Sequence, residues 1–186
     1  PLEWATAYAT DTLLDAKQAG YAVPDARLNE VLGWIEGRVA AYERGEKIIH
    51  AAWNHYDEQA EAYLHYVLAR AGRGKKARIL KLLGDIPANG NLEQAEDRYL
   101  LEAALYLSGD RRYEAQLKQV DASPIHDERI NDWSFFSDRR RRGEMLSIFF
   151  DLFGADPAGQ PLADRVAETL RDEPGYYYTT QELVWG

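Results

Sequence analysis

The feature that most constrains the fold is the recurrence of apolar residues at helical spacing along nearly the whole chain. Residues three and four apart lie on one face of a helix, and strand-like alternation of period two is missing. The four stripes are Leu28, Val31, Leu32, Ile35, Val39 and Tyr42; Tyr56, Ala60, Tyr63, Leu64, Val67, Leu68 and Ala71; Tyr99, Ala103 and Tyr106; and Met145, Ile148, Phe149 and Leu152. The sequence therefore predicts an all-α protein.

Glycine, proline and short polar residues mark where the predicted helices end and begin. Glycine suits the left-handed conformation that commonly ends a helix, while serine and aspartate cap its first amide groups and proline suits its first turn. The glycines that follow a helical stretch are Gly20, Gly72, Gly84, Gly109 and Gly154. The residues that suit a helix start are Pro24, Asp110, Ser137 and Pro161. These signals predict about nine helices with short connections.

The predicted helices form a loose repeat of pairs. The first members are TAYATDTLLDAKQAG, AEAYLHYVLARAG, EDRYLLEAALYLSG and RGEMLSIFFDLFG, which are rich in Tyr, Phe or Leu and end in glycine. The more charged second members are ARLNEVLGWIEGRVAAYERG, KKARILKLLGD, RRYEAQLKQVD and LADRVAETLRD. Their spacing is too irregular for a regular solenoid. It favours pairs arranged around a centre, with the apolar members inside and the charged members outside.

The last segment resembles the beginning of one more helix. Pro174 and Gly175 break the chain, residues 176–178 are tyrosines that favour an extended backbone, and Thr179 with Glu182 forms a capping-box pattern. We therefore expect residues 1–186 to be a single domain that forms an incomplete ring of helix pairs. Such a ring would expose an apolar seam, through which the protein could associate with itself.

Three stretches of the chain carry a further signal. They are WATAYATDTLLDAKQAGYAVPDARLNEVLGWI at Trp4–Ile35, AEAYLHYVLARAG at Ala60–Gly72 and GYYYTTQELVWG at Gly175–Gly186. These stretches resemble the thioester domain of the alpha-2-macroglobulin and complement family, in particular its bacterial members. Members show a similar tryptophan-led helix and a glycine–tyrosine–threonine–glutamine segment before a late helix. The resemblance covers most of the chain.

This resemblance implies an α/α toroid, in agreement with the repeat of helix pairs. It also implies a parent protein that traps proteases, usually through a cysteine–glutamine thioester that bonds covalently to the attacking protease. The implied partners are the other domains of that parent chain and the target proteases. The implied location is periplasmic or extracellular, where many bacterial members are tethered to the inner membrane by a lipid anchor.

The absence of cysteine departs from the family pattern, in which the thioester motif is a cysteine, two residues and a glutamine. In the family this motif lies upstream of the tryptophan-led helix. It therefore either precedes Pro1, or the parent belongs to the subgroup that lacks it. Without cysteine the chain has no disulfide, thiolate metal site or cysteine nucleophile. We expect residues 1–186 to have no enzymatic activity of their own.

Histidine is the residue type that the resemblance connects with catalysis, and the chain has His50, His55, His65 and His126. In complement-type relatives a histidine between the second and third of these helices activates the thioester, and His50 occupies about that place. A general base there would assist attack by a hydroxyl group. The alternative is a polar residue of a surface loop. His55 and His65 cannot share one tight metal site, and without a His-Glu-x-x-His motif we expect no metal and no cofactor.

A toroid enzyme acting on a glycan is the main alternative function. Terpene cyclases need aspartate-rich motifs and prenyltransferases of this shape need a cysteine-bound zinc, and the sequence has neither. Glycan hydrolases need two carboxylates beside a cleft. Asp57, Glu58 and Glu61 follow HAAWNHY, whose aromatic side chains could stack on sugars, but the more ordinary interpretation is the acidic first turn of a helix. A helical scaffold with an open superhelix is a third possibility.

Composition limits the remaining classes of partner. The net charge of −9 argues against nucleic acid, because binding of phosphates requires a surplus of Lys and Arg. One basic run, Arg139–Arg142, is interpreted as a solvated first turn or as a set of partners for carboxylates. No apolar run approaches the roughly 18 residues of a membrane span. Because the chain begins at Pro1 without a start methionine, we expect a processed or excised segment, and the missing signal peptide leaves its compartment open.

Overall fold

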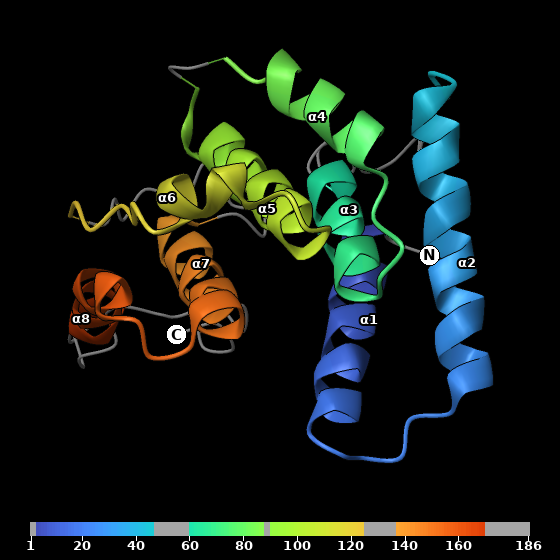
Figure 1. The fold of residues 1–186 in the computed structure, drawn as a ribbon, viewed down its shortest axis with the longest axis horizontal. Coiled ribbons are helices and arrows are strands. Elements are labelled where there is room, and N and C mark those ends of the chain that lie inside the picture. The colour runs from blue at the N-terminus through green and yellow to red at the C-terminus, as the bar shows by residue number, and fades with distance from the viewer. Residues whose placement is uncertain (1–2, 47–59, 88–89, 125–136, 170–186) are drawn as a thin grey trace.

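The computed structural model describes residues 3–46, 60–87, 90–124 and 137–169. Over these ranges the protein consists of helices and turns, without a strand (Figure 1). The α-helices are α1 (Glu3–Gln18), α2 (Asp25–Glu43), α3 (Ala60–Arg70), α4 (Lys76–Asp85), α5 (Leu92–Leu107), α6 (Glu114–Leu117), α7 (Asp138–Phe153) and α8 (Gln160–Thr169). The 3₁₀ turns η1 (Arg111–Tyr113) and η2 (Pro157–Gly159) lead into α6 and α8. The predicted all-α class is confirmed for this part of the chain.

Helices α1 and α3 pack against each other and run in the same direction. Near their starts, the rings of Trp4 and Tyr63 have centroids 6.1 Å apart. Near their ends, Arg70 lies 2.5 Å from the carboxylate of Asp15. Since early residues meet early residues and late ones meet late ones, the two helices are parallel.

Helices α5 and α7 also pack against each other and run in the same direction, and α5 packs on α3. Glu96 in the second turn of α5 pairs with Arg140 in the first turn of α7 at 2.6 Å. Tyr106 near the end of α5 packs edge-on against Phe153 at the end of α7, with ring centroids 5.2 Å apart. Arg140 at the start of α7 lies beside Trp4 at the start of α1, and Asp151 near the end of α7 lies 3.6 Å from Arg70 at the end of α3. The four odd-numbered helices from α1 to α7 therefore run parallel, with their N-terminal halves on the same side.

The longer even-numbered helices lie against these four. Helix α2 is antiparallel to α1, because Glu3 bonds to Arg38 late in α2 while Lys17 pairs with Asp25 at its start, each at 2.6 Å. Helix α4 packs on α5, and α8 packs on α7. Figure 1 shows α1 and α2 side by side along their lengths, with α7 and α8 on the side of the molecule away from α2.

The core follows the predicted stripes. Nearly all of α3 is buried, whereas the described side chains of α4 and α8 bury only two apolar positions each. The buried stripe residues are Leu28, Leu32, Ile35, Val39, Ala60, Tyr63, Leu64, Val67, Leu68, Tyr99, Ala103, Met145, Ile148 and Phe149. Tyr56, predicted to begin the second stripe, lies outside the described residues. The expected contrast between apolar first members and amphipathic second members is clearest for the pair α3 and α4.

The predicted helix ends are right at four glycines and wrong at one. Gly20, Gly72, Gly109 and Gly154 follow their helices with positive φ angles of 88°, 75°, 90° and 61°. Gly84 instead lies inside α4, which continues to Asp85. The helix ends there because Pro87 follows, and a residue before proline avoids the helical conformation. Ile86 accordingly has an extended backbone, with φ −78° and ψ 122°.

The predicted helix starts are close to the observed ones. Ser137 caps α7, because its hydroxyl accepts the amide hydrogen of Arg140 at 3.1 Å. Asp110 caps η1 rather than an α-helix. Pro24 directly precedes α2, and Pro161 is the second residue of α8. The capping box of Thr179 and Glu182 falls outside the described residues. In the part of the chain that the structure describes, no helix is long and apolar enough to cross a membrane.

Candidate functional site

The basic run at the start of α7 is buried. Arg139, Arg140, Arg141 and Arg142 are 8%, 2%, 1% and 0% exposed. A helix distributes four consecutive residues around its whole circumference, so neighbouring segments must cover α7 on every side at this level. The interpretation of the run as a solvated first turn is therefore wrong, and the alternative, that the arginines serve carboxylates, is confirmed for Arg140–Arg142.

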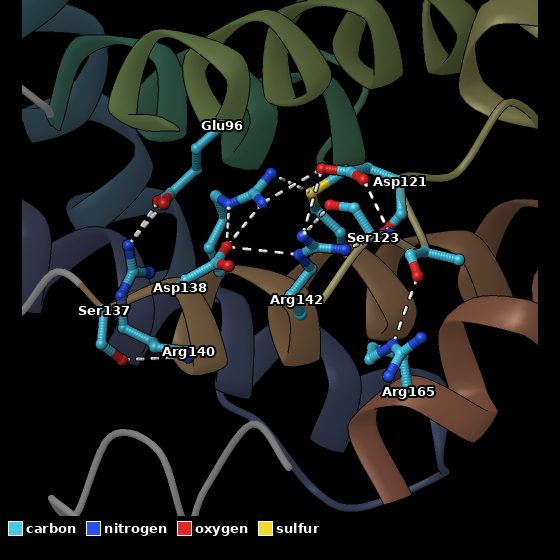
Figure 2. Close-up of polar contacts among 11 residues, drawn as sticks. Glu96, Asp121, Ser123, Ser137, Asp138, Arg140, Arg142 and Arg165 are labelled. Atoms are coloured by element: carbon cyan, nitrogen blue, oxygen red, sulfur yellow. Dashed lines mark hydrogen bonds and ion pairs between the residues drawn. The ribbon is translucent and has the colours of Figure 1, made fainter. Parts of the chain in front are cut away.

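Arg140 joins two carboxylates from different helices, and we call Glu96, Arg140 and Glu144 the central cluster. Its Nη2 atom lies 2.6 Å from both carboxylate oxygens of Glu96 on α5, and its Nη1 atom donates to Oε2 of Glu144 at 2.7 Å. The guanidinium carbon also lies 5.8 Å from the centre of the Trp4 ring on α1. Figure 2 shows Arg140 extending from α7 toward Glu96. One side chain thus connects α7 to α5 and α1.

The central cluster has two carboxylates facing one guanidinium. Burial, the largest effect, raises the pKa of Glu144 well above its ordinary value, and the negative charges of Glu96 and Asp11 raise it further, against the opposing effect of Arg140. The second carboxylate oxygen of Glu144, Oε1, is buried without a hydrogen-bond partner, which also disfavours the ionised form. Burial would lower the pKa of Arg140, but the two carboxylates outweigh it and raise that pKa. Arg140 therefore stays charged, while the site favours the protonated form of Glu144.

A second group of ion pairs, which we call the Asp138 cluster, consists of Asp121, Ser123, Asp138, Arg141 and Arg142. Oδ1 of Asp138 accepts from Nη2 of Arg141 at 2.5 Å and from Nε of Arg142 at 3.2 Å. Arg142 also donates to the carbonyl oxygen of Asp121 and to the hydroxyl of Ser123 (Figure 2). The cluster therefore attaches the segment before residue 124 to the start of α7.

A third group, the Arg70 cluster, lies between α1, α3 and α7 and consists of Asp11, Asp15, Arg70 and Asp151. Arg70 bonds to Asp11 and Asp15 of α1 and lies 3.6 Å from Asp151 of α7. The hydroxyl of Tyr63 donates to Asp11 at 3.1 Å. Burial raises the pKa of Asp11 and of Asp151, and in both cases the charge of Arg70 opposes it.

Two further carboxyl groups of α5 have raised pKa values. Burial, followed by the charges of Glu96, Glu93 and Glu61, raises the pKa of Asp97 to about 8. Burial raises the pKa of Glu102 to about 7, although the charge of Arg98 opposes it. Two acids of α5, the buried Glu102 and the half-buried Asp97, therefore hold their protons to a higher pH than exposed carboxyl groups do.

The histidine candidates fall mainly outside the described residues. His50, the residue that the resemblance connects with thioester activation, lies there together with His55 and His126, so its role stays a prediction. His65 lies in α3 and is fully buried. Its Nε2 atom is 3.9 Å from Oε1 of Glu61, which is longer than a hydrogen bond.

The acidic residues considered for glycan hydrolysis are divided in the same way, since Asp57 and Glu58 lie outside the described residues. Glu61 lies in the first turn of α3, as the more ordinary interpretation predicts, and it accepts two hydrogen bonds from Arg78 of α4 at 2.5 and 3.0 Å. Among the residues that the structure describes, no group of three or more His, Cys, Asp or Glu side chains could hold a metal ion.

The chemical capacity of these clusters follows from their burial and partners. A glycosidase needs an acid and a second carboxylate that reach the substrate. Glu96 and Glu144 are 8% and 1% exposed, and Arg140 binds both. Asp138 is likewise buried between two arginines. What this arrangement can do is hold α7 in one position relative to α1, α3 and α5.

Sequence reasoning missed the polar interior. It placed apolar faces at the centre, whereas Asp11, Glu96 and Glu144 are buried there too. Arg140 and Glu144 are four residues apart, so the sequence alone could have predicted an ion pair between them on one helix. The pairing of Arg140 with Glu96 joins two distant helices and has no local signal.

Comparison of the chain with protein-family models finds no match, and searches of curated proteins and of solved structures find none either. A functional interpretation therefore depends on the residues themselves and on the arrangement of the helices.

Proposed function

We propose that the chain is a non-catalytic part of a macroglobulin-like protease trap, built as a segment of an α/α toroid of the thioester-domain type. The observation that supports the proposal most is the order of helix packing. The odd-numbered helices from α1 to α7 are parallel neighbours, and α2, α4 and α8 lie against them. This is the order expected when the first members of successive helix pairs surround a centre. The three stretches that resemble the family add the trap function.

In this proposal the ion-pair clusters have a structural role. They fix α7 against α1, α3 and α5, so that the domain can present a defined surface to other domains of its parent chain. The same parent would meet target proteases in the periplasm or outside the cell. Neither role requires a catalytic group within residues 1–186.

The test uses the full-length parent protein and a set of proteases of different specificity. A trap that encloses a protease should block cleavage of a large protein substrate while leaving cleavage of a short peptide substrate largely intact, because only the large substrate is excluded. Equal inhibition of both substrates would indicate an active-site inhibitor, and no inhibition of any protease would contradict the proposal.

A second measurement decides between the two forms of the trap. The intact mass of the parent is compared before and after treatment with methylamine. A gain of one methylamine would show a thioester in the parent, and His50→Ala should then slow transfer of the acyl group to a hydroxyl. An unchanged mass would favour the subgroup without the motif, in which the protease is held without a covalent bond.

Self-association through an apolar seam is part of the same proposal. Leu13 of α1 and Phe150 of α7 are 38% and 46% exposed, although both are large and apolar. Sedimentation equilibrium over a range of concentrations would reveal a dimer, and Phe150→Ser should weaken it. A chain that stays monomeric at every concentration would remove this part of the proposal without affecting the trap.

A further inference from the structure

Helix α7 packs against the other inner helices through an excess of acidic groups. Glu144 faces Glu96 of α5 and Asp11 of α1, together with the phenol groups of Tyr63 and Tyr66 on α3. On its own helix it faces Arg140, which also binds Glu96. Arg70, the arginine between α1, α3 and α7, is shared by three aspartates of the Arg70 cluster.

On the other side of α7, several acidic side chains each have a basic partner. The pairs are Asp138 with Arg141 and Arg142, Asp121 with Arg141 and Arg142, Asp156 with Lys118, and Glu168 with Arg165. None of these acids acts on Glu144 among the causes that raise its pKa. The imbalance of charge is therefore concentrated where α7 meets α1, α3 and α5.

From this geometry we propose that the packing of α7 takes up one proton at Glu144, whose carboxylate shares one guanidinium with that of Glu96, so that α7 is held less firmly as the pH rises. Two adjacent carboxylates in a water-poor site cannot both be ionised at low cost when they share one guanidinium. If α7 separates, water solvates both carboxylates and the proton is released. The packing of this helix is thus a pH-sensitive attachment, and this inference does not depend on the proposed function.

The direction follows from proton linkage. A carboxyl group whose pKa is higher when packed than when separated contributes its full stabilisation below its ordinary value, which is 4.5 for Glu144. This contribution decreases as the pH rises from 4.5 to the raised pKa of Glu144 in the packed state. Within this window, the equilibrium constant for packing falls by up to about tenfold per pH unit for one proton.

The test is hydrogen exchange of the full chain between pH 6 and pH 8, with each rate divided by the intrinsic rate at the same pH. The protection of amides in α7 should fall in the wild type by up to about tenfold per pH unit. Glu144→Gln keeps the shape and a hydrogen-bond donor but cannot lose a proton, so it should flatten this dependence. Glu168→Gln, an exposed change on α8, is the matched control and should leave it intact.

The other acids with raised pKa values, namely Asp11, Asp97, Glu102 and Asp151, also change the pH dependence of the whole molecule, so the test depends on the difference between variants. Glu96→Gln removes the negative charge beside Glu144 and should reduce the dependence, which keeps the test valid if Glu144→Gln does not fold. The inference is overturned if α7 protection in the wild type is independent of pH. It is also overturned if each folded glutamine variant keeps the full wild-type dependence.

Discussion

Two kinds of contact hold the inner helices together. Helices α3 and α5 pack mainly through apolar side chains, whereas α7 contacts α1 and α5 through charged side chains. The first joins two helices whose buried residues are mainly apolar, including Leu64, Leu68 and Leu100. The second depends on Arg140, which binds Glu96 of α5 and lies over the Trp4 ring of α1. It also depends on Arg70 of α3, which lies between Asp11 of α1 and Asp151 of α7. An apolar contact has no preferred direction and loses stability gradually, whereas a buried ion pair depends on geometry and on both partners being present.

Different helix contacts within this one fold therefore differ in their sensitivity to pH and salt. The apolar contacts between α3 and α5 should themselves respond little to pH and salt, and the response of this region near neutrality should come from Asp97 and Glu102 of α5. The charged contacts of α7 should respond to pH, because their acids outnumber their arginines and bind protons on packing. The two regions can therefore be separated by mutation and by solution conditions.

Arg140→Ala should have the largest effect on stability. It removes the only guanidinium that the structure shows bound to both Glu96 and Glu144, and leaves two carboxylates buried together. We expect a loss of about 3–5 kcal/mol in the free energy of unfolding, measured by urea denaturation. The matched control is Arg27→Ala, since Arg27 and Glu30 are 79% and 69% exposed and such pairs contribute about 0.5 kcal/mol or less.

The triple variant Arg140→Met, Glu96→Leu and Glu144→Leu sharpens this prediction. If the loss in Arg140→Ala comes from uncompensated charge, replacing the whole central cluster by apolar groups should restore most of it. A triple variant as unstable as Arg140→Ala would show instead that the shape of the arginine side chain, rather than charge balance, supports α7.

Leu68→Ala should weaken the apolar region. Leu68 is fully buried in α3, so its truncation removes apolar contacts and leaves a cavity, at a cost of about 2–5 kcal/mol. This loss should be the same at pH 6 and pH 8, since no titrating group is removed. A loss that changed between these pH values would contradict the separation of the two regions.

Glu102→Gln should change the pH dependence of stability from within α5. Because burial raises the pKa of Glu102 from 4.5 to about 7, its contribution is complete below pH 4.5 and falls as the pH rises to 7. The fall is at most about 1.4 kcal/mol per pH unit. The glutamine variant lacks it, so its stability relative to the wild type should increase across this window and then level off. Parallel stability curves for the two proteins would exclude this role of Glu102.

The sequence predicted the helices better than it predicted their contacts. Apolar spacing located α2, α3, α5 and α7, because residues that share a helix face are determined by local geometry. Ser137 was found as the cap of α7 for the same reason. The predicted helix end at Gly84 was wrong because the prediction relied on the glycine, whereas Pro87 is the residue that ends α4. All of these signals act within a few residues.

The buried charges could not be predicted in this way. A run of four arginines is commonly solvated, and only the positions of Glu96 and Asp121 in space show that it is covered and paired. Contacts between residues distant in the chain depend on how whole helices pack, which periodicity does not specify. The first helices of the predicted pairs were expected to pack at the centre through apolar residues. The structure shows that ion pairs also connect them.

Ser137→Ala should have the smallest effect, and it separates local helix formation from the ion pairs that follow. The hydroxyl of Ser137 accepts the amide hydrogen of Arg140 at 3.1 Å, so the variant leaves that amide without its cap and should lower the free energy of unfolding by about 1 kcal/mol. Ser137→Thr keeps a capping hydroxyl and should lose less. If urea denaturation shows no loss in the alanine variant, the arginine contacts alone determine where α7 begins. If instead the loss approaches that of Arg140→Ala, the cap must be required for the central cluster to assemble, and the charged region would depend on local helix formation as much as the apolar region does.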